Sequence, residues 1–182
     1  MVWRAQDPQG NEAAKCRFDI VPYTRGQGLD LGCGPFKAFP HFIGVDNGHH
    51  AKMFGWPGRP DVHVDTAEDL KPFASGSMDF CFSSHLLEHI QDYKGALIEW
   101  SRVVRDGGYL ILYLPSDELY PKVGEPGANP DHRWNVNYDK VVEAMMGVDR
   151  SWDLVEYQKR DTDNGPGQPG NEYSLLFVFK FT

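Results

Sequence analysis

The sequence predicts a single α/β domain, and two observations support that prediction. Short apolar runs alternate with amphipathic stretches along the chain, which is the pattern of strands joined by helices. The length of 182 residues suits one hydrophobic core, because single domains commonly run to roughly 100–200 residues.

Seven apolar segments are predicted to be strands, each bounded by turn-forming or polar residues. They are Gly28–Leu31, Phe42–Val45, Val62–Val64, Met78–Phe82, Tyr109–Leu114, Trp152–Tyr157 and Tyr173–Phe181. Pro115 ends the fifth, since proline lacks the amide hydrogen that a ladder needs. Residues 161–171, between the last two strands, are expected to form a long hairpin loop.

Four segments are predicted to be helices from their caps and apolar spacing. They are Asn11–Ile20 with Asn11 as its N-cap, Ser84–Asp92 with Ser84 as its N-cap, Tyr93–Val104, and Tyr138–Met146. Asp106-Gly107-Gly108 is expected to be the turn that follows the third helix. Only residues 36–40 join the first strand region to the second, which is too short for a helix, and the Gly/Pro-rich residues 47–60 are expected to be non-helical.

Composition and charge argue against several kinds of partner and location. The net charge is −8 with no run of lysine and arginine, so nucleic acid is not expected as a partner. No stretch approaches the roughly 18 apolar residues of a membrane helix. The N-terminus has no apolar signal core, so a cytoplasmic protein is expected. Cys16, Cys33 and Cys81 form no C-x-x-C pair and are expected to be reduced.

A glycine turn and an acidic strand end suggest a nucleotide-type site. Gly32 and Gly34 follow the first strand and allow a sharp turn close to a ligand. The second strand ends in Asp46, whose carboxylate could accept hydrogen bonds from both hydroxyls of a ribose. The dinucleotide fingerprint needs a third glycine at position 37, where Lys37 stands instead.

Four segments, in order, resemble class I S-adenosylmethionine-dependent methyltransferases, and most closely the small "type 11" branch. The glycine loop is residues 29–35, LDLGCGP, and the adenine-side segment is residues 65–73, DTAEDLKPF. The fourth strand and its following helix correspond to residues 77–90, SMDFCFSSHLLEHI, and the next helix, Gly-Gly turn and strand to residues 99–110, EWSRVVRDGGYL. The resemblance implies a Rossmann-like, mostly parallel seven-stranded sheet with an antiparallel last strand. The sequence departs from the family at residues 36–40 and 47–60, so its helical layers are expected to be trimmed after strands 1 and 2.

The resemblance also implies site residues and a division of the domain. Residues 1–26 would form a helical cover, 27–115 a cofactor-binding half and 116–182 a substrate-side half. S-adenosylmethionine would contact Asp30, Gly32, Cys33, Gly34, Asp46, Asn47, Asp65, Thr66 and Ser83. The glycines would pack against its methionine part, Asp46 would bind the ribose, and Asp65 and Thr66 would meet the adenine. Thr66 and Ala67 could exchange places in that last contact.

Acceptor contacts are expected from the loop after the fifth strand and from the start of the helix at 84. His85 and His132 are the candidate general bases. Tyr120, Asp131 and Trp134 are the candidate substrate contacts, and either aromatic could face the sulfonium. The alternative is that Trp134 is packing and His132 caps the next helix.

Residues 85–89, HLLEH, match the inverted zinc-protease signature H-x-x-E-H. A third protein ligand on a following helix would also be required, and the sequence offers no clear candidate. No metal is therefore expected, and a helix cap with an ion pair near the pocket is the preferred interpretation.

The predicted function is in-line methyl transfer to a small-molecule acceptor. The alternatives are a non-catalytic S-adenosylmethionine-binding module and a nicotinamide-dependent oxidoreductase, against which Lys37 argues. Because the helical layers are trimmed, one face of the sheet needs a cover, which either the N-terminal helix or a second subunit of a homodimer would provide.

Overall fold

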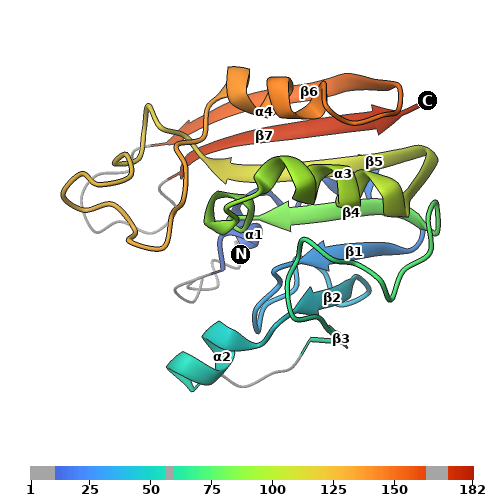
Figure 1. The fold of residues 1–182 in the computed structure, drawn as a ribbon, viewed down its shortest axis with the longest axis horizontal. Helices are drawn as coiled ribbons and strands as arrows, with labels where there is room; N and C mark the ends of the chain where they lie inside the picture. Colours follow the sequence, from blue (N-terminus) through green and yellow to red (C-terminus); the bar gives the residue numbers. More distant parts are fainter. Residues whose placement is uncertain (1–10, 56–59, 163–171) are drawn as a thin grey trace, which may run out of the picture.

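The computed structural model describes residues 11–55, 60–162 and 172–182, and they form one seven-stranded mixed sheet (Figure 1). The strands are β1 (Gly28–Leu31), β2 (Ile43–Asp46), β3 (Val62–His63), β4 (Met78–Ser84), β5 (Val104–Pro115), β6 (Trp152–Thr162) and β7 (Glu172–Phe181). Their order is β3-β2-β1-β4-β5-β7-β6. Only β7 runs against its neighbours. The predicted fold class and the antiparallel last strand are confirmed.

Helices cover one face of the sheet. They are α3 (Tyr93–Val103), α4 (Tyr138–Met145) and the 3-10 turn η2 (Leu87–His89). Asp92 and Asn137 cap α3 and α4 with their side chains, accepting from the amides of Gly95 and Lys140. Alternate residues of β5, such as Leu110 and Leu112, point into the core beneath these helices. Successive residues of a strand point to opposite faces, so the residues between them face the other side of the sheet.

The N-terminal segment covers the other face. The helix α1 (Ala13–Cys16) and the turn η1 (Val21–Tyr23) lie behind the sheet in Figure 1. Ala13, Cys16 and Ile20 pack with residues of β4, β5 and β7 in a second core cluster. One of the two expected covers is therefore present within the chain itself. A homodimer stays a prediction.

Two helix predictions were wrong in extent or existence. The N-terminal helix has four residues rather than ten, and the residue before it is Glu12, not Asn11. Residues 47–60 contain a six-residue helix, α2 (His49–Phe54), which the left-handed Gly55 ends. Both predictions relied on local amino-acid composition, whereas tertiary packing and a glycine C-cap decide where these helices begin and end.

No helix begins at Ser84, which is the last residue of β4. The amide of His85 still donates to Tyr113 of β5 at 2.8 Å. His85 then adopts a positive φ of 49°, which reverses the chain and is unusual for a residue with a side chain. Only the short η2 follows before α3 begins.

The turn predicted at Asp106-Gly107-Gly108 lies instead within β5, which begins at Val104 directly after α3. The pairing register with β4 shifts between Met78 and Phe80 opposite this stretch. A Cβ on Gly108 would lie 2.6 Å from the Asp79 carbonyl oxygen. The two glycines therefore form an irregularity that brings the strands close together.

The hairpin loop predicted for 161–171 lies outside the described residues from 163 onward. Cys16, Cys33 and Cys81 are free and buried. Within the described ranges, no helix is both long and apolar enough to cross a membrane.

Candidate active site

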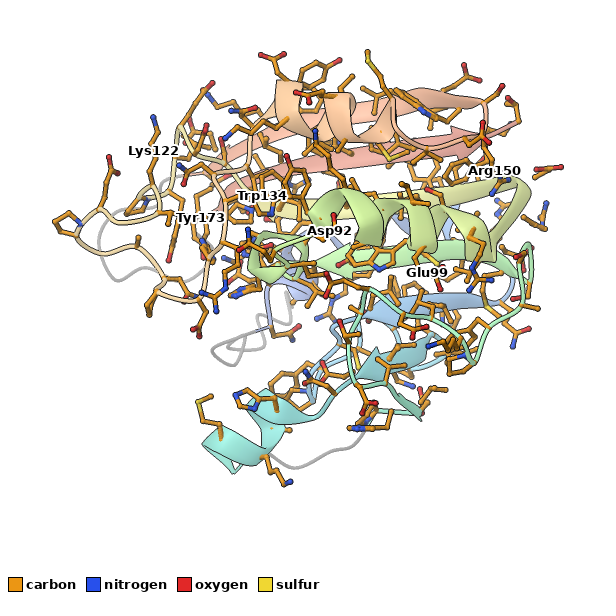
Figure 2. All side chains as sticks on the ribbon, viewed as in Figure 1. Asp92, Glu99, Lys122, Trp134, Arg150 and Tyr173 are labelled. Atoms are coloured by element: carbon orange, nitrogen blue, oxygen red, sulfur yellow. The ribbon has the colours of Figure 1, made fainter. Side chains whose placement is uncertain are left out.

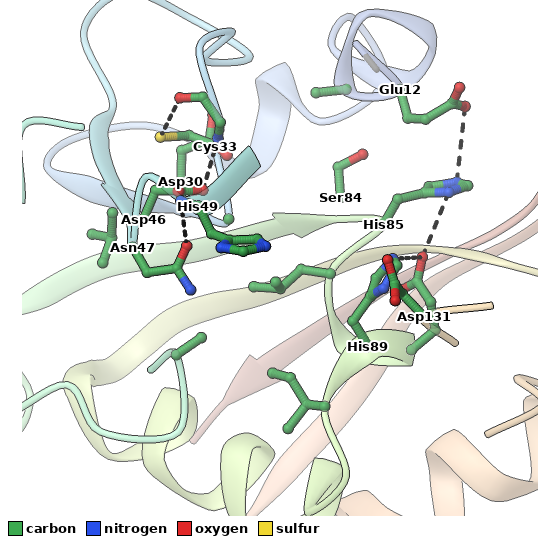
Figure 3. A pocket seen from close by; sticks show the side chains of 18 of the residues that line it. Glu12, Asp30, Cys33, Asp46, Asn47, His49, Ser84, His85, His89 and Asp131 are labelled. Atoms are coloured by element: carbon green, nitrogen blue, oxygen red, sulfur yellow. Dashed lines mark hydrogen bonds and ion pairs between the residues drawn. The ribbon is translucent and has the colours of Figure 1, made fainter. Parts of the chain in front are cut away.

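A cavity of about 840 Å³ opens at the carboxyl ends of β1, β2 and β4. Its size lies within the roughly 300–1,000 Å³ range of ligand pockets. Ligands of open α/β sheets bind at this edge, because loops diverge there. Figure 3 shows two sides of the pocket, with Cys33, Asp46, Asn47 and His49 on one side and Glu12, His85, His89 and Asp131 on the other.

The glycine loop forms one wall of the cavity. Gly32 has a φ of 69° and Gly34 a φ of 52°, and such values are easy only for glycine. The Gly32 amide donates to the Val45 carbonyl at 2.8 Å, which holds the loop against β2. A Cβ on Gly34 would meet no atom within 4 Å. Gly34 therefore leaves open space on the cavity side, where a ligand could approach the backbone.

Two aspartates hold this loop in place. Asp46 accepts from the Gly34 amide at 2.9 Å and from the Gly48 amide at 2.6 Å, each with a different carboxylate oxygen. Each oxygen retains a further lone pair for a ligand hydroxyl. Asp30 is buried and accepts from the Ala38 amide at 2.7 Å. Burial raises the pKa of Asp30 to about 7.

Residues 65–67, which follow β3, form the end of the cavity wall that contains the glycine loop. Asp65, Thr66 and Ala67 all line the cavity, so both alternatives for the second adenine contact remain open. The Thr66 hydroxyl donates to Glu68 at 2.9 Å and accepts from its amide at 3.2 Å. The Ala67 carbonyl accepts from the Trp100 indole at 2.7 Å, which ties the segment to α3.

Two predicted site residues lie outside the cavity lining. Ser83 is fully buried, and its hydroxyl has no hydrogen-bond partner among the described residues. Its neighbour Ser84 lines the cavity instead, since alternate residues of a strand face opposite sides. Trp134 stacks on Tyr93 with centroids 3.9 Å apart and donates to the Leu87 carbonyl at 3.0 Å. Trp134 therefore packs against its neighbours, which was the alternative interpretation of this residue in the sequence.

The other predicted residues line the cavity together. They are Asp30, Gly32, Cys33, Gly34, Asp46, Asn47, Asp65, Thr66, His85, Tyr120, Asp131 and His132. Tyr120 lies 5.3 Å from His132 and 5.0 Å from Tyr173, measured between ring centroids. Residues 116–135 and the start of β7 therefore close the side opposite the glycine loop.

Three histidines surround one buried glutamate on that side. Glu88 is 0% exposed, and neither carboxylate oxygen has a hydrogen-bond partner among the described residues. Its Oε1 lies 3.6 Å from His85 Nδ1 and 3.8 Å from both His89 Nε2 and His132 Nε2. Burial raises the pKa of Glu88 to about 8 and lowers that of His85 to about 3. Burial also lowers the pKa of His132.

Hydrogen bonds fix the positions of these groups. His85 Nε2 lies 2.9 Å from the Ser174 hydroxyl, which leaves Nδ1 facing Glu88. The Arg133 amide donates to the Glu88 carbonyl at 2.8 Å. This backbone contact brings His132, 43 positions after His89 in the sequence, onto η2.

Sequence reasoning missed several lining residues, among them Glu12, His49 and Tyr173. Glu12 enters from the N-terminal segment, and its carboxylate lies 3.9 Å from His85 Nε2. Tyr173 is the second residue of β7, which the apolar pattern marked only as strand. Nothing in the local sequence distinguishes these residues, because the fold alone brings their elements to this edge.

Acidic side chains dominate the charge of the cavity. Seven acidic residues line it, two of them (Asp30 and Glu88) with a pKa raised by burial, against one arginine, Arg133, and no lysine among the described residues. They are Glu12, Asp30, Asp46, Asp65, Glu68, Glu88 and Asp131. A cleft lined by one sign of charge attracts ligands of the other sign. The site therefore favours a cationic ligand.

Comparison with known proteins agrees with the resemblance of the motifs. A family model described as a methyltransferase domain matches residues 29–112. An uncharacterised methyltransferase of Mycobacterium tuberculosis is 34% identical over 94 residues, which cover 46% of this chain and 37% of that protein. The chain thus spans little more than a third of the length of the curated relatives it matches.

Solved structures match most of the chain. A SAM-dependent methyltransferase from Archaeoglobus fulgidus has a TM-score of 0.63 and 17% identity, covering 92% of both chains. A methyltransferase from Haloferax volcanii, solved in complex with a methyltransferase activator, has a TM-score of 0.64 and 19% identity, covering 93% of this chain and 88% of that one. At these identities the matches show the fold.

Proposed function

We propose that this chain is a class I S-adenosylmethionine-dependent methyltransferase that transfers a methyl group from S-adenosylmethionine to a small-molecule acceptor, a proposal that the match of residues 29–112 to a methyltransferase-domain model supports. The main support is the open space at Gly34 beside the Asp46 carboxylate, within a cavity of about 840 Å³. A ligand lying along the glycine loop would place its hydroxyls within reach of Asp46.

The electrostatics of the cavity suit this cofactor. S-adenosylmethionine supplies a methyl group on a sulfonium, which is positively charged and already a good leaving group. Seven acidic residues line the cavity, so the positive charge is favoured there. Asp30 and Asp46 keep the loop shaped for the cofactor through the Ala38, Gly34 and Gly48 amides.

The residues of this chain would act chiefly by alignment. In-line attack needs the acceptor atom and the methyl carbon held together, and such positioning can contribute about 7–11 kcal/mol. The glycine loop would hold the cofactor on one side of the cavity, and His85 and Asp131 would hold the acceptor on the other (Figure 3), together with Tyr120 and His132. Closure of this side by residues 116–135 would limit entry of water.

Calorimetric titration tests the cofactor assignment. S-adenosylhomocysteine is expected to bind one site per chain, whereas NAD⁺ is expected not to bind, because Lys37 replaces the third glycine of the dinucleotide fingerprint. Binding of NAD⁺ with no binding of S-adenosylhomocysteine would favour the oxidoreductase. Tight binding of S-adenosylhomocysteine without transfer to any acceptor in a broad panel would favour the non-catalytic binding module.

Substitution of His132 tests the acceptor side. We expect His132→Ala to lower turnover while the affinity for S-adenosylhomocysteine holds, since His132 lines the cavity beside Glu88 and His89 rather than beside the glycine loop. Unchanged turnover with an accepted substrate would remove His132 from the reaction.

A further inference from the structure

The groups around Glu88 have a spacing that hydrogen bonding does not explain. The three imidazole nitrogens lie 3.6–3.8 Å from Glu88 Oε1, whereas hydrogen bonds of this kind span about 2.7–3.2 Å. A carboxylate that is 0% exposed and lacks any hydrogen-bond partner among the described residues is costly. Something other than these side chains is needed to satisfy it.

A metal ion would account for this spacing. One ligand atom each from Glu88, His89 and His132 lie within 4.8 Å of one another. Donors that share a tetrahedral zinc at about 2.0–2.1 Å are roughly 3.3 Å apart. To bind a common ion, each histidine nitrogen would need to approach Glu88 Oε1 by about 0.5 Å, and the most widely separated donors, at most 4.8 Å apart, by up to about 1.5 Å.

We propose that Glu88, His89 and His132 bind a divalent transition-metal ion of the Zn²⁺ class, with His85 Nδ1 adjacent to the site at 3.6 Å from Glu88 Oε1. Two or three imidazoles with one carboxylate favour zinc or ferrous iron over magnesium or calcium, which prefer oxygen ligands. The third protein ligand that H-x-x-E-H lacked in the sequence is His132. It comes from a loop rather than from a following helix.

Hydrogen bonds around the cluster support this assignment. Metal-binding histidines commonly use their second ring nitrogen in a hydrogen bond that fixes the ring. His85 has this arrangement, with Nε2 2.9 Å from the Ser174 hydroxyl and Nδ1 toward Glu88. The Arg133 amide and the Trp134 indole donate to the carbonyls of Glu88 and Leu87 at 2.8 and 3.0 Å. These bonds hold His132 in reach of η2.

The cluster lines the same cavity as the glycine loop. An ion there, with a coordination position open to the cavity, would bind an acceptor through an oxygen atom and lower the pKa of a bound hydroxyl. This role rests on the proposed methyl transfer. Binding of the ion itself does not.

Zn²⁺ binding to the full chain tests the site. Equilibrium dialysis of chelator-stripped protein, read by mass spectrometry of the metal, is expected to give one Zn²⁺ per chain. Glu88→Gln and His132→Ala should each weaken the affinity by at least the roughly 10–100-fold that loss of an outer-shell partner costs. His63→Ala is the matched control, because His63 is exposed on β3 and does not line the cavity. It should bind Zn²⁺ as the wild type does.

Two further measurements separate a lost ligand from a misfolded variant. Glu88→Gln keeps the side-chain shape and replaces a buried carboxyl group by an uncharged amide, so the metal-free variant should melt near the wild-type temperature. Its zinc-induced rise in Tm should be absent. X-ray absorption should show nitrogen and oxygen ligands at about 2.0–2.1 Å in the wild type.

The site is overturned if the wild type binds no stoichiometric Zn²⁺, or if binding survives in Glu88→Gln and His132→Ala. Titration of the wild type with S-adenosylhomocysteine in chelator is a separate readout. Loss of cofactor binding there contradicts the proposed function, whereas absence of zinc binding contradicts only the metal site.

Discussion

At the scale of single residues, the site depends on backbone positions that only glycine adopts without strain. Gly34 has a φ of 52° and no atom within 4 Å of where a Cβ would lie. Gly48 shares both properties, with a φ of 69°, yet it is not among the lining residues of the cavity. Alanine substitutions at Gly34 and Gly48 therefore separate the effect of backbone strain from the effect of filling space that a ligand would occupy.

We expect Gly34→Ala to weaken S-adenosylhomocysteine binding at least about tenfold, or about 1.4 kcal/mol. Gly48→Ala should carry a similar backbone cost of roughly 1–2 kcal/mol in stability but leave the affinity near that of the wild type. Calorimetric titration and thermal melting of both variants provide the comparison. Equal loss of affinity in the two variants would show that strain, not occupied space, is responsible.

Asp79 offers a test of pH dependence away from the cavity. Its carboxylate accepts from the Gln27 amide at 2.7 Å and from Arg105 Nε at 2.6 Å. The Gln27 amide first, and then Arg105, lower the pKa of Asp79. A lowered pKa in the folded state stabilises the fold above the usual pKa, near 3.8, and this stability is lost as the pH falls through the folded value.

Asp79→Asn is therefore expected to lower the free energy of unfolding by about 1–3 kcal/mol at pH 7. The difference from the wild type should begin to shrink below about pH 4, where the unfolded wild type takes up a proton, and should vanish only below the lowered pKa of folded Asp79. Urea unfolding between pH 3 and pH 7 measures it. A difference that stays constant over this range would contradict the electrostatic explanation.

At the scale of elements, the loop of residues 129–135 is attached to η2 and α3. Trp134 stacks on Tyr93 of α3 and donates to the Leu87 carbonyl of η2. In Figure 2, Trp134 is labelled just above η2, and Arg150 is labelled at the opposite end of the sheet. These bonds place His132 and Asp131 at the cavity, so the tryptophan positions the loop without lining the site.

Trp134→Phe should keep most of the stacking but leave the Leu87 carbonyl without its donor. We expect a loss of about 1–3 kcal/mol in stability, with the affinity for S-adenosylhomocysteine unchanged. Chemical unfolding and calorimetric titration measure the two quantities. Unchanged stability together with a raised KM for an acceptor would instead indicate a direct substrate contact.

At the scale of the whole molecule, the N-terminal segment is part of the core. Ile20 is 0% exposed, whereas Phe18, two residues earlier, is 79% exposed. Arg160 of β6 pairs with Asp19 at 2.8 Å and donates to the Lys15 carbonyl at 3.2 Å. The segment is thus attached to the sheet by apolar packing and by polar contacts.

Ile20→Ala should lower the free energy of unfolding by about 2–5 kcal/mol, because it leaves a cavity in the second core cluster. Phe18→Ala is the control and should change it by no more than about 0.5 kcal/mol. Light scattering of the wild type decides the predicted homodimer independently. A small effect of Ile20→Ala would mean that the cover is dispensable.

The sequence by itself determined the strands and the order of the motifs, and it predicted the residues of the proposed cofactor side. Periodic apolar runs and glycine turns are local signals, so Gly32, Gly34 and Asp46 could be proposed without coordinates. The sequence also predicted a helix at Ser84, which was wrong, because pairing of His85 with Tyr113 extends β4 and a positive φ then turns the chain.

Only the tertiary structure decided what surrounds Glu88. Glu12, His85, His132 and Ser174 come from four separate parts of the chain, and the fold brings them to one edge of the sheet. No local pattern records such contacts, since burial and distance between distant residues are properties of packing. The same packing places Trp134 behind the loop of residues 129–135 and brings His132 next to the H-x-x-E-H segment.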